Sequence, residues 1–176
     1  PETKDPYIVT TSPVSMDSAA ETNIFGSNPG LESDEWWKNS HNWTNADYSL
    51  VTDVKHGGNS SLKYSGAQNW DNGLYTPDIT VKPNTNYTFS FWVRGDENGD
   101  VFGCMLDDND KIGGSGENEI VLKPPVFDKQ WHQVGYTFNT GTCTVIRFTV
   151  GPGGGTVYFD DFQLFEATTT TPETKD

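Results

Sequence analysis

The sequence is poor in basic residues and has no long apolar run. Its 176 residues include 11 Lys and Arg against 25 Asp and Glu, which gives a formal net charge of -14. A field of that sign repels phosphate backbones and anionic lipid headgroups. No stretch approaches the roughly 20 apolar residues that a membrane helix needs. We therefore expect neither nucleic acid nor a membrane as a partner.

Cysteine and the strong helix formers are also scarce. The only cysteines are Cys104 and Cys143. If Phe102 and Leu106 face the core and Arg147 does not, strand alternation sends the two thiols to opposite sides of their sheet, which predicts no disulfide. Ala, Leu and Arg are few, whereas Gly, Asn, Thr and aromatic residues are plentiful. This composition predicts an all-β domain.

The sequence contains none of the common hydrolase motifs. There is no Gly-x-Ser-x-Gly elbow, no His-Glu-x-x-His helix and no Glu-x-Asp-x-x-Glu strand. Asp107 and Asp71 are the carboxylates expected on an open sheet face, and they are not spaced as an acid and base pair on neighbouring strands. We predict that the chain is not an enzyme.

The two ends of the chain repeat one pentapeptide. PETKD opens the sequence at residues 1–5 and closes it at residues 172–176, where four threonines precede it. Thr- and Pro-rich linkers are extended and typical of modular extracellular proteins. We expect a linker and N-terminal extension over 1–20, one module over 21–167 and a linker over 168–176. The module is expected to be monomeric, with neighbouring modules in a secreted or cell-surface bacterial protein.

Turn signals recur every 8 to 12 residues or so, as in a β-sandwich. Eight or nine strands are expected, and the segments that predict them are NSSLKYSG, LYTPDITV, YTFSFWVR, VFGCMLD, EIVLKP, WHQVGYTFN, TVIRFTV and TVYFDDFQLFE. Alternation within them gives a core set: Tyr87, Phe89, Phe91, Val93, Ile146, Phe148 and Val150. Trp92 and Arg147 fall on the opposite parity. We expect them to line one shallow groove on an open sheet face.

An aromatic residue in a polar loop is the clearest sign of a binding surface. Trp70 lies between Asn69 and Asp71, and the next apolar side chain after it is that of Leu74. A sugar ring stacks its C–H bonds on such an indole, and its hydroxyls need polar partners beside it. Trp70 with Gln68, Asp71 and Asn72 supplies both. The alternative is that Trp70 anchors the loop on its own strand.

Five segments in order resemble the carbohydrate-binding modules of families 4, 9 and 22 and their relatives. The segments are NIFGSNPGLES, GGNSSLKYSG, GLYTPDITVKPNTNYTFSFWVRG, QWHQVGYTFNTG and VYFDDFQLFE, and together they span about 23–166. The resemblance implies a jelly-roll sandwich of two antiparallel sheets. It also implies a sugar cleft across the concave sheet and a structural calcium ion away from it.

The resemblance further implies roles for particular residues. It places Trp70 at the aromatic platform before a concave strand and Arg147 at a sugar-contacting position on a concave strand. The residues themselves leave alternatives open. Tyr75 is at the rim or in the core, Trp92 is a platform or fills a gap beneath a loop, and Arg147 is a sugar contact or a solvated or ion-paired residue. Of the adjacent Trp36 and Trp37, one is expected in the core and the other partly exposed, where it could extend the groove. Trp131 is expected in the core.

For calcium, the resemblance singles out Glu32 and Asp160, with Asp161 as the alternative to Asp160. Backbone carbonyls near Ser60 and in the N-terminal loop would complete the shell. Hard oxygen ligands from distant strands would tie the ends of the chain together and stabilise the fold. Gly57 and Gly58 stand where related modules can have another acidic ligand.

We therefore expect a non-catalytic module that binds polysaccharide or oligosaccharide chains, and the resemblance favours β-glucan or xylan. It would target a secreted multimodular protein to its substrate. An α-glucan such as starch is the alternative ligand, because curved chains also stack on paired indoles. A structural or adhesive sandwich without sugar affinity is the alternative of another class.

Overall fold

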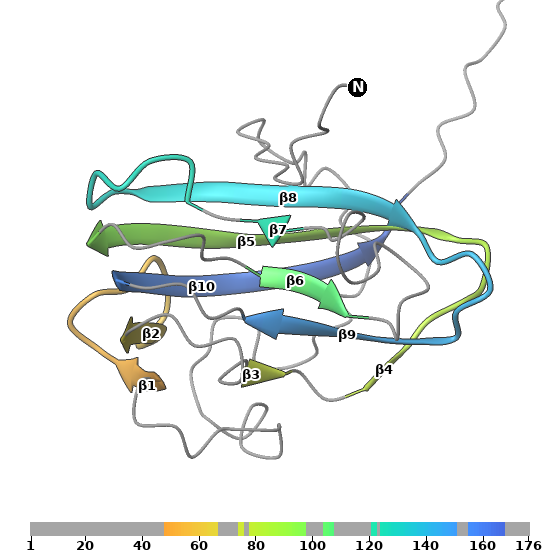
Figure 1. Cartoon of the computed structure of the whole chain (residues 1–176), viewed down its shortest axis with the longest axis horizontal. Helices are drawn as coiled ribbons and strands as arrows, with labels where there is room; N and C mark the ends of the chain where they lie inside the picture. Colours follow the sequence, from red (N-terminus) through yellow and green to blue (C-terminus); the bar gives the residue numbers. More distant parts are fainter. Residues whose placement is uncertain are drawn as a thin grey trace, which may run out of the picture.

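The computed structural model of the chain describes residues 48–66, 74–75, 78–97, 104–107, 121–122, 124–150 and 155–167. These residues form ten strands and two antiparallel sheets (Figure 1). None of the described residues belongs to a helix that is long and apolar enough to span a membrane. The predicted all-β sandwich is confirmed.

The larger sheet is built on two long strands. Its order is β1 (Tyr48–Val51), β2 (Ser61–Gly66), β10 (Gly155–Glu166), β5 (Asn86–Glu97) and β8 (Trp131–Asn139). β5 and β10 have 12 residues each and pair along most of their length. We call this the long-strand sheet. Its strands are rich in aromatic and β-branched residues, which pack well on a pleated surface.

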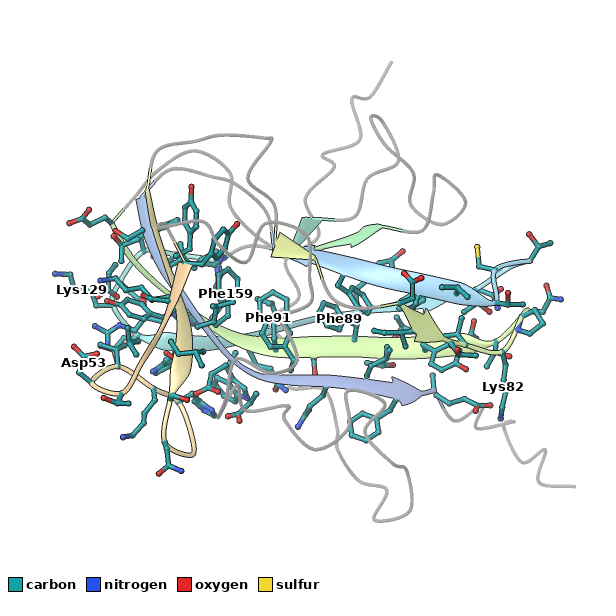
Figure 2. The ribbon with its side chains drawn as sticks, turned by 90° about the horizontal axis from the view of Figure 1, so that it is seen from below. Asp53, Lys82, Phe89, Phe91, Lys129 and Phe159 are labelled. Carbon is teal, nitrogen blue, oxygen red and sulfur yellow. The ribbon has the colours of Figure 1, made fainter. Side chains whose placement is uncertain are left out.

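The second sheet consists of shorter strands. Its order is β3 (Leu74–Tyr75), β9 (Val145–Val150), β6 (Cys104–Asp107) and β7 (Val121–Leu122), and β4 (Ile79–Thr80) also pairs with β9. We call this the short-strand sheet. Figure 2, turned from the first view, shows the two sheets as separate layers.

Aromatic side chains fill the space between the layers. The rings of Phe89 on β5 and Phe148 on β9 stack across the sandwich, with centroids 3.9 Å apart. Phe89, Phe91 and Phe159 lie between the two sheets in Figure 2. The predicted core residues Tyr87, Phe89, Phe91, Val93, Ile146 and Phe148 are all buried. Aromatic stacking adds specific geometry to the large apolar area that these rings remove from water.

A β-bulge in β10 keeps the core continuous. Phe159 and Phe162 are three residues apart, so simple alternation would place them on opposite faces, yet both are buried. The register with β5 shifts between Asp160 and Gln163, and Asp161 has a φ of 51°. The extra residue restores the inward parity for Phe162 and Leu164.

Three details differ from the sequence-based expectation. First, β1 was not predicted. Second, the expected strand LYTPDITV is two strands, β3 and β4. Pro77 stands between them in the sequence, and proline has no N–H to donate to a strand ladder. Cys143 was expected to face away from the core, but it is buried. It lies in the turn before β9, where alternation does not apply, and its N–H donates to the Thr140 carbonyl at 2.9 Å. The Cys104 side chain is outside the described ones, so the absence of a disulfide stays a prediction.

Candidate functional site

The outer face of the short-strand sheet includes the position of Arg147. In β9, Ile146 and Phe148 are buried between the sheets, whereas Val145 is 46% exposed. Because successive strand positions alternate between faces, position 147 belongs with Val145 to the outer face. The predicted polar contact thus lies on a strand face that points away from the core.

The neighbouring strands bring further candidate residues to this face. Tyr75 on β3 stands opposite Thr149 on β9, and Asp107 on β6 stands opposite Arg147. Directly opposed residues of antiparallel strands share a face, with Cβ atoms about 4.5–5.5 Å apart. Tyr75 and Arg147 therefore occupy adjacent strands on one face, two positions apart along β9. Their sugar contacts stay predictions.

The remaining sugar-contact candidates lie outside the described residues. They are Trp36, Trp37, Gln68, Trp70, Asp71 and Asn72. Four of them precede β3 closely in the chain, because β3 begins at Leu74. β3 is the strand at the edge of the short-strand sheet next to β9. The chain therefore enters the candidate face directly from the segment that contains Trp70.

Trp92 lies elsewhere, and the expectation of one groove shared with Arg147 is wrong. Trp92 belongs to β5 of the long-strand sheet, whereas Arg147 belongs to β9 of the other sheet. The imidazole of His56 stacks on the indole, with centroids 3.9 Å apart and planes 14° apart. One face of Trp92 is therefore occupied by the chain's own loop. Both strands carry the same alternation, and alternation alone cannot assign a strand to a sheet.

Trp131 is not a core residue, contrary to the expectation. It is half-buried, and its parity in β8 is opposite to that of buried Val134. Its ring meets His56 edge-on, with centroids 5.7 Å apart. Trp92, Trp131 and His56 thus form one aromatic cluster on the outer face of the long-strand sheet. The loop over residues 52–60, which carries His56, covers this part of the sheet.

The carboxylate of Asp160 holds this loop to the sheet. Asp160 is fully buried, and its Oδ2 accepts the backbone N–H groups of His56 and Gly57 at 2.8 and 3.1 Å. Its Oδ1 accepts the N–H of Asp161 at 2.8 Å. Burial raises the pKa of Asp160 to about 6, although the three N–H donors act in the opposite direction.

Asp161 binds the same loop from the other side of the bulge. Its Oδ2 lies 2.6 Å from His56 Nδ1. A Cβ at Gly57 would come within 3.0 Å of that same oxygen, so the absence of a side chain there permits the close approach. Gly58 has a φ of 56°, which glycine adopts without strain. The two glycines are explained by the path of this loop.

Asp160, Asp161 and Ser60 carry oxygen atoms of the kind that calcium binds. Oxygen is the donor that calcium prefers, and the two aspartates supply carboxylates beside buried Ser60. Asp160 Oδ1 accepts the N–H of Asp161, and a carboxylate oxygen has two lone pairs. Within the described ranges no three His, Cys, Asp or Glu side chains gather as a metal cluster, and Glu32 lies outside those ranges. The described residues fit part of a calcium shell.

Sequence reasoning missed the role of His56. Nothing in the sequence assigns His56 a role, and no spacing links it to Trp92, which lies on another element. The available signal was Asp160 and Asp161 within the aromatic strand TVYFDDFQLFE, because a carboxylate that such a strand buries requires N–H donors or a cation. The donors come from a Gly-rich loop whose backbone can approach closely.

A family model described as a carbohydrate binding domain matches residues 25–154 of the chain. The chain belongs to this family. The matched range lies inside the module expected over residues 21–167 and contains both strands of the candidate face that hold Tyr75 and Arg147. Members of this family are described as domains that bind carbohydrate, not as catalytic domains, and we refer to the chain below as the carbohydrate-binding domain. No curated protein sequence matches it significantly.

Solved structures of carbohydrate-binding modules share the fold. A family 16 carbohydrate-binding module has a TM-score of 0.55 and 18% identity, and the match covers 80% of this chain and 98% of that one. The CBM22-2 xylan-binding domain from Paenibacillus barcinonensis Xyn10C has a TM-score of 0.54 and 17% identity, over 78% and 97% of the two chains. TmCBM61 in complex with β-1,4-galactotriose has a TM-score of 0.51 and 17% identity, over 83% and 99%. The predicted jelly-roll fold is confirmed.

Proposed function

We propose that the carbohydrate-binding domain binds single chains of β-glucan or xylan on the outer face of the short-strand sheet. One observation carries the proposal: Tyr75 and Arg147 occupy adjacent strands of that face, and the Trp70 segment leads into β3. The family supplies the ligand class, since its members are carbohydrate binding domains.

The chemistry of the candidate residues suits a sugar chain. Trp70 offers a flat aromatic surface to the C–H bonds of a pyranose ring. Gln68, Asp71, Asn72 and Arg147 offer donors and acceptors for the hydroxyl groups. Trp36 or Trp37 would extend the contact along the chain. Trp92 contributes less in this proposal, because His56 already covers one face of its ring.

The ligands named for two similar structures support a β-linked chain. One such domain is named as xylan-binding, and another was solved with β-1,4-galactotriose. Identities of 17% do not choose between these ligands, so β-glucan and xylan are kept as the pair that the sequence favours. Starch is the alternative that a ligand panel must include.

The wider role that we propose is targeting. The repeated PETKD segments support a place among other modules of a secreted or cell-surface bacterial protein. Polysaccharide binding by a monomeric module would keep a neighbouring module close to its substrate. The excess of acidic residues fits this setting, since neutral polysaccharide does not repel it.

Affinity electrophoresis tests the proposal. The whole chain is run through gels that contain β-glucan, xylan, galactan or starch, beside a matched pair of variants, Trp70→Ala and Trp92→Ala. We expect β-glucan or xylan to retard the wild type and Trp70→Ala to weaken that binding roughly tenfold or more. Trp92→Ala should keep the affinity and lower the thermal midpoint.

The contrary outcomes are distinct. Retardation by starch alone would replace the β-glucan or xylan assignment with an α-glucan. Retardation by none of the polymers would favour a structural or adhesive sandwich. A large fall in the thermal midpoint of Trp70→Ala would show that this indole anchors its loop.

We also propose a structural calcium ion held by Asp160, Glu32 and a carbonyl near Ser60, with Asp161 as the alternative carboxylate. The support is the buried Asp160 side chain, whose pKa burial raises to about 6. A cation bound by this carboxylate would stabilise its ionised form. Calcium would tie the loop at residues 52–60 to β10 and take no part in sugar contact.

Chelation tests the calcium proposal. Removal of calcium should lower the thermal midpoint of the domain, because a ligand that binds only the folded state adds stability by mass action. The affinity for polysaccharide should stay unchanged, because the proposed calcium site takes no part in sugar contact. Readdition of Ca²⁺ should restore the midpoint, whereas Mg²⁺ at the same concentration should not. A midpoint that chelator leaves unchanged would remove calcium from the account.

A further inference from the structure

The strands of the short-strand sheet carry two charged residues, which have opposite sign and stand opposite each other on neighbouring strands. Among the residues that the structure assigns to β3, β4, β6, β7 and β9, Asp107 and Arg147 are the only charged ones. The β6–β9 register places them directly opposite each other. They therefore share a face, with Cβ atoms about 4.5–5.5 Å apart. The strands of this sheet sum to zero charge.

This arrangement bears on which glycans the face accepts. An arginine alone on a sheet face attracts carboxylates, because its guanidinium matches their two oxygens. A carboxylate at the opposed position cancels that attraction locally. The whole chain, at a net charge of -14, then repels an anionic polymer.

We propose that Asp107 sets ligand charge specificity: by neutralising Arg147 it makes the face select uncharged glycans over uronate-bearing glycans. This rests on the proposed function, since it concerns the same face. Asp107 is a specificity residue here and not half of a catalytic pair. A carboxylate and a guanidinium on one face together supply the acceptors and donors that sugar hydroxyl groups need.

The experiment compares two polymers that differ only in their carboxylates. Glucuronoxylan and its carboxyl-reduced form are the probes, and the measured quantity is the ratio of their dissociation constants at low salt. Wild type should bind the reduced form more tightly. Asp107→Asn should shift the ratio about three- to tenfold toward the acidic polymer, an effect that added salt should diminish.

Two further variants make the result specific. Asp53→Asn removes the same charge from an exposed site in the loop at residues 52–60 and should leave the ratio unchanged. Arg147→Gln should shift the ratio in the opposite direction from Asp107→Asn. If Asp107→Asn fails to fold, the Arg147→Gln shift, read against Asp53→Asn, decides the proposal.

The outcomes separate this inference from the proposed function. The wild type could bind the reduced xylan while Asp107→Asn and Arg147→Gln leave the ratio of dissociation constants unchanged. That result would overturn the proposed role of Asp107 and leave the proposed function standing. An equal shift with Asp53→Asn would also overturn it, since the cause would be net charge. Tighter wild-type binding to the acidic polymer would contradict it directly. If wild type bound no polymer of either the panel or this pair, the proposed function would fail as well.

Discussion

The two sheets of the carbohydrate-binding domain differ in what occupies their outer faces. On the long-strand sheet, the chain's own loop covers Trp92 through His56 and is tied to buried Asp160. Arg94 and Asp96 form an ion pair there, with Nε and Oδ1 2.6 Å apart. On the short-strand sheet, Val145 is exposed, and the strands carry only Asp107 and Arg147 as charges.

The difference indicates a division of labour. Long paired strands and an anchored loop supply stability, so we assign the scaffold to the long-strand sheet. Short strands that receive polar and aromatic segments at their ends suit a ligand face, since binding residues are often placed on loops held by a rigid scaffold. Variants on the two sheets should therefore separate stability from affinity.

The largest expected effect is on the scaffold. Asp160→Ala leaves the N–H groups of His56, Gly57 and Asp161 without their acceptor. We expect the free energy of unfolding to fall by about 3 kcal/mol, because unsatisfied buried donors are costly. Urea unfolding with chelator present isolates this effect from any metal. A loss below about 0.5 kcal/mol would mean that the Asp160 carboxylate does not hold the loop at residues 52–60.

A smaller effect is expected from the aromatic stack. His56→Ala removes the ring that lies 3.9 Å from Trp92 and the contact of Nδ1 with Asp161. We expect a loss of about 1 kcal/mol in unfolding free energy, together with a change in tryptophan fluorescence as the indole becomes exposed. Affinity for polysaccharide should stay within error. A weakened affinity at unchanged stability would place the ligand on the long-strand sheet.

The smallest effect compares one exposed position on each sheet. Val145→Lys adds a long side chain to the outer face of the short-strand sheet, and Thr137→Lys adds the same side chain to the long-strand sheet. Val145→Lys should weaken binding about threefold through steric competition with the ligand, equivalent to roughly 0.7 kcal/mol. Thr137→Lys should leave the affinity unchanged. The reverse pattern, measured by calorimetry, would exchange the roles of the two faces.

The sequence predicts most of the core because the core follows strand alternation. Tyr87, Phe89, Phe91 and Val93 are buried as the pattern in YTFSFWVR requires. The bulge in β10 breaks the same rule and was not predicted, although Phe159 and Phe162 differ in parity and two aspartates lie between them. Cys143 was misplaced because the pattern was extended past the start of β9 into a turn.

The site was less predictable because it depends on which strands become neighbours. Trp92 and Arg147 have the same pattern around them, and only strand pairing assigns them to different sheets. The opposed pair of Asp107 and Arg147 likewise exists only in the β6–β9 register. The contact of His56 with Trp92 depends on the path of a loop, which no periodicity encodes.

The most direct test is to locate the ligand by NMR. A β-glucan or xylan oligosaccharide is titrated into the labelled domain, and backbone amide shifts are followed in both sheets. The account predicts that shifts will concentrate in β3, β6 and β9, with β2, β5 and β10 nearly unchanged. Shifts centred on His56, Trp92 and Trp131 instead would contradict it.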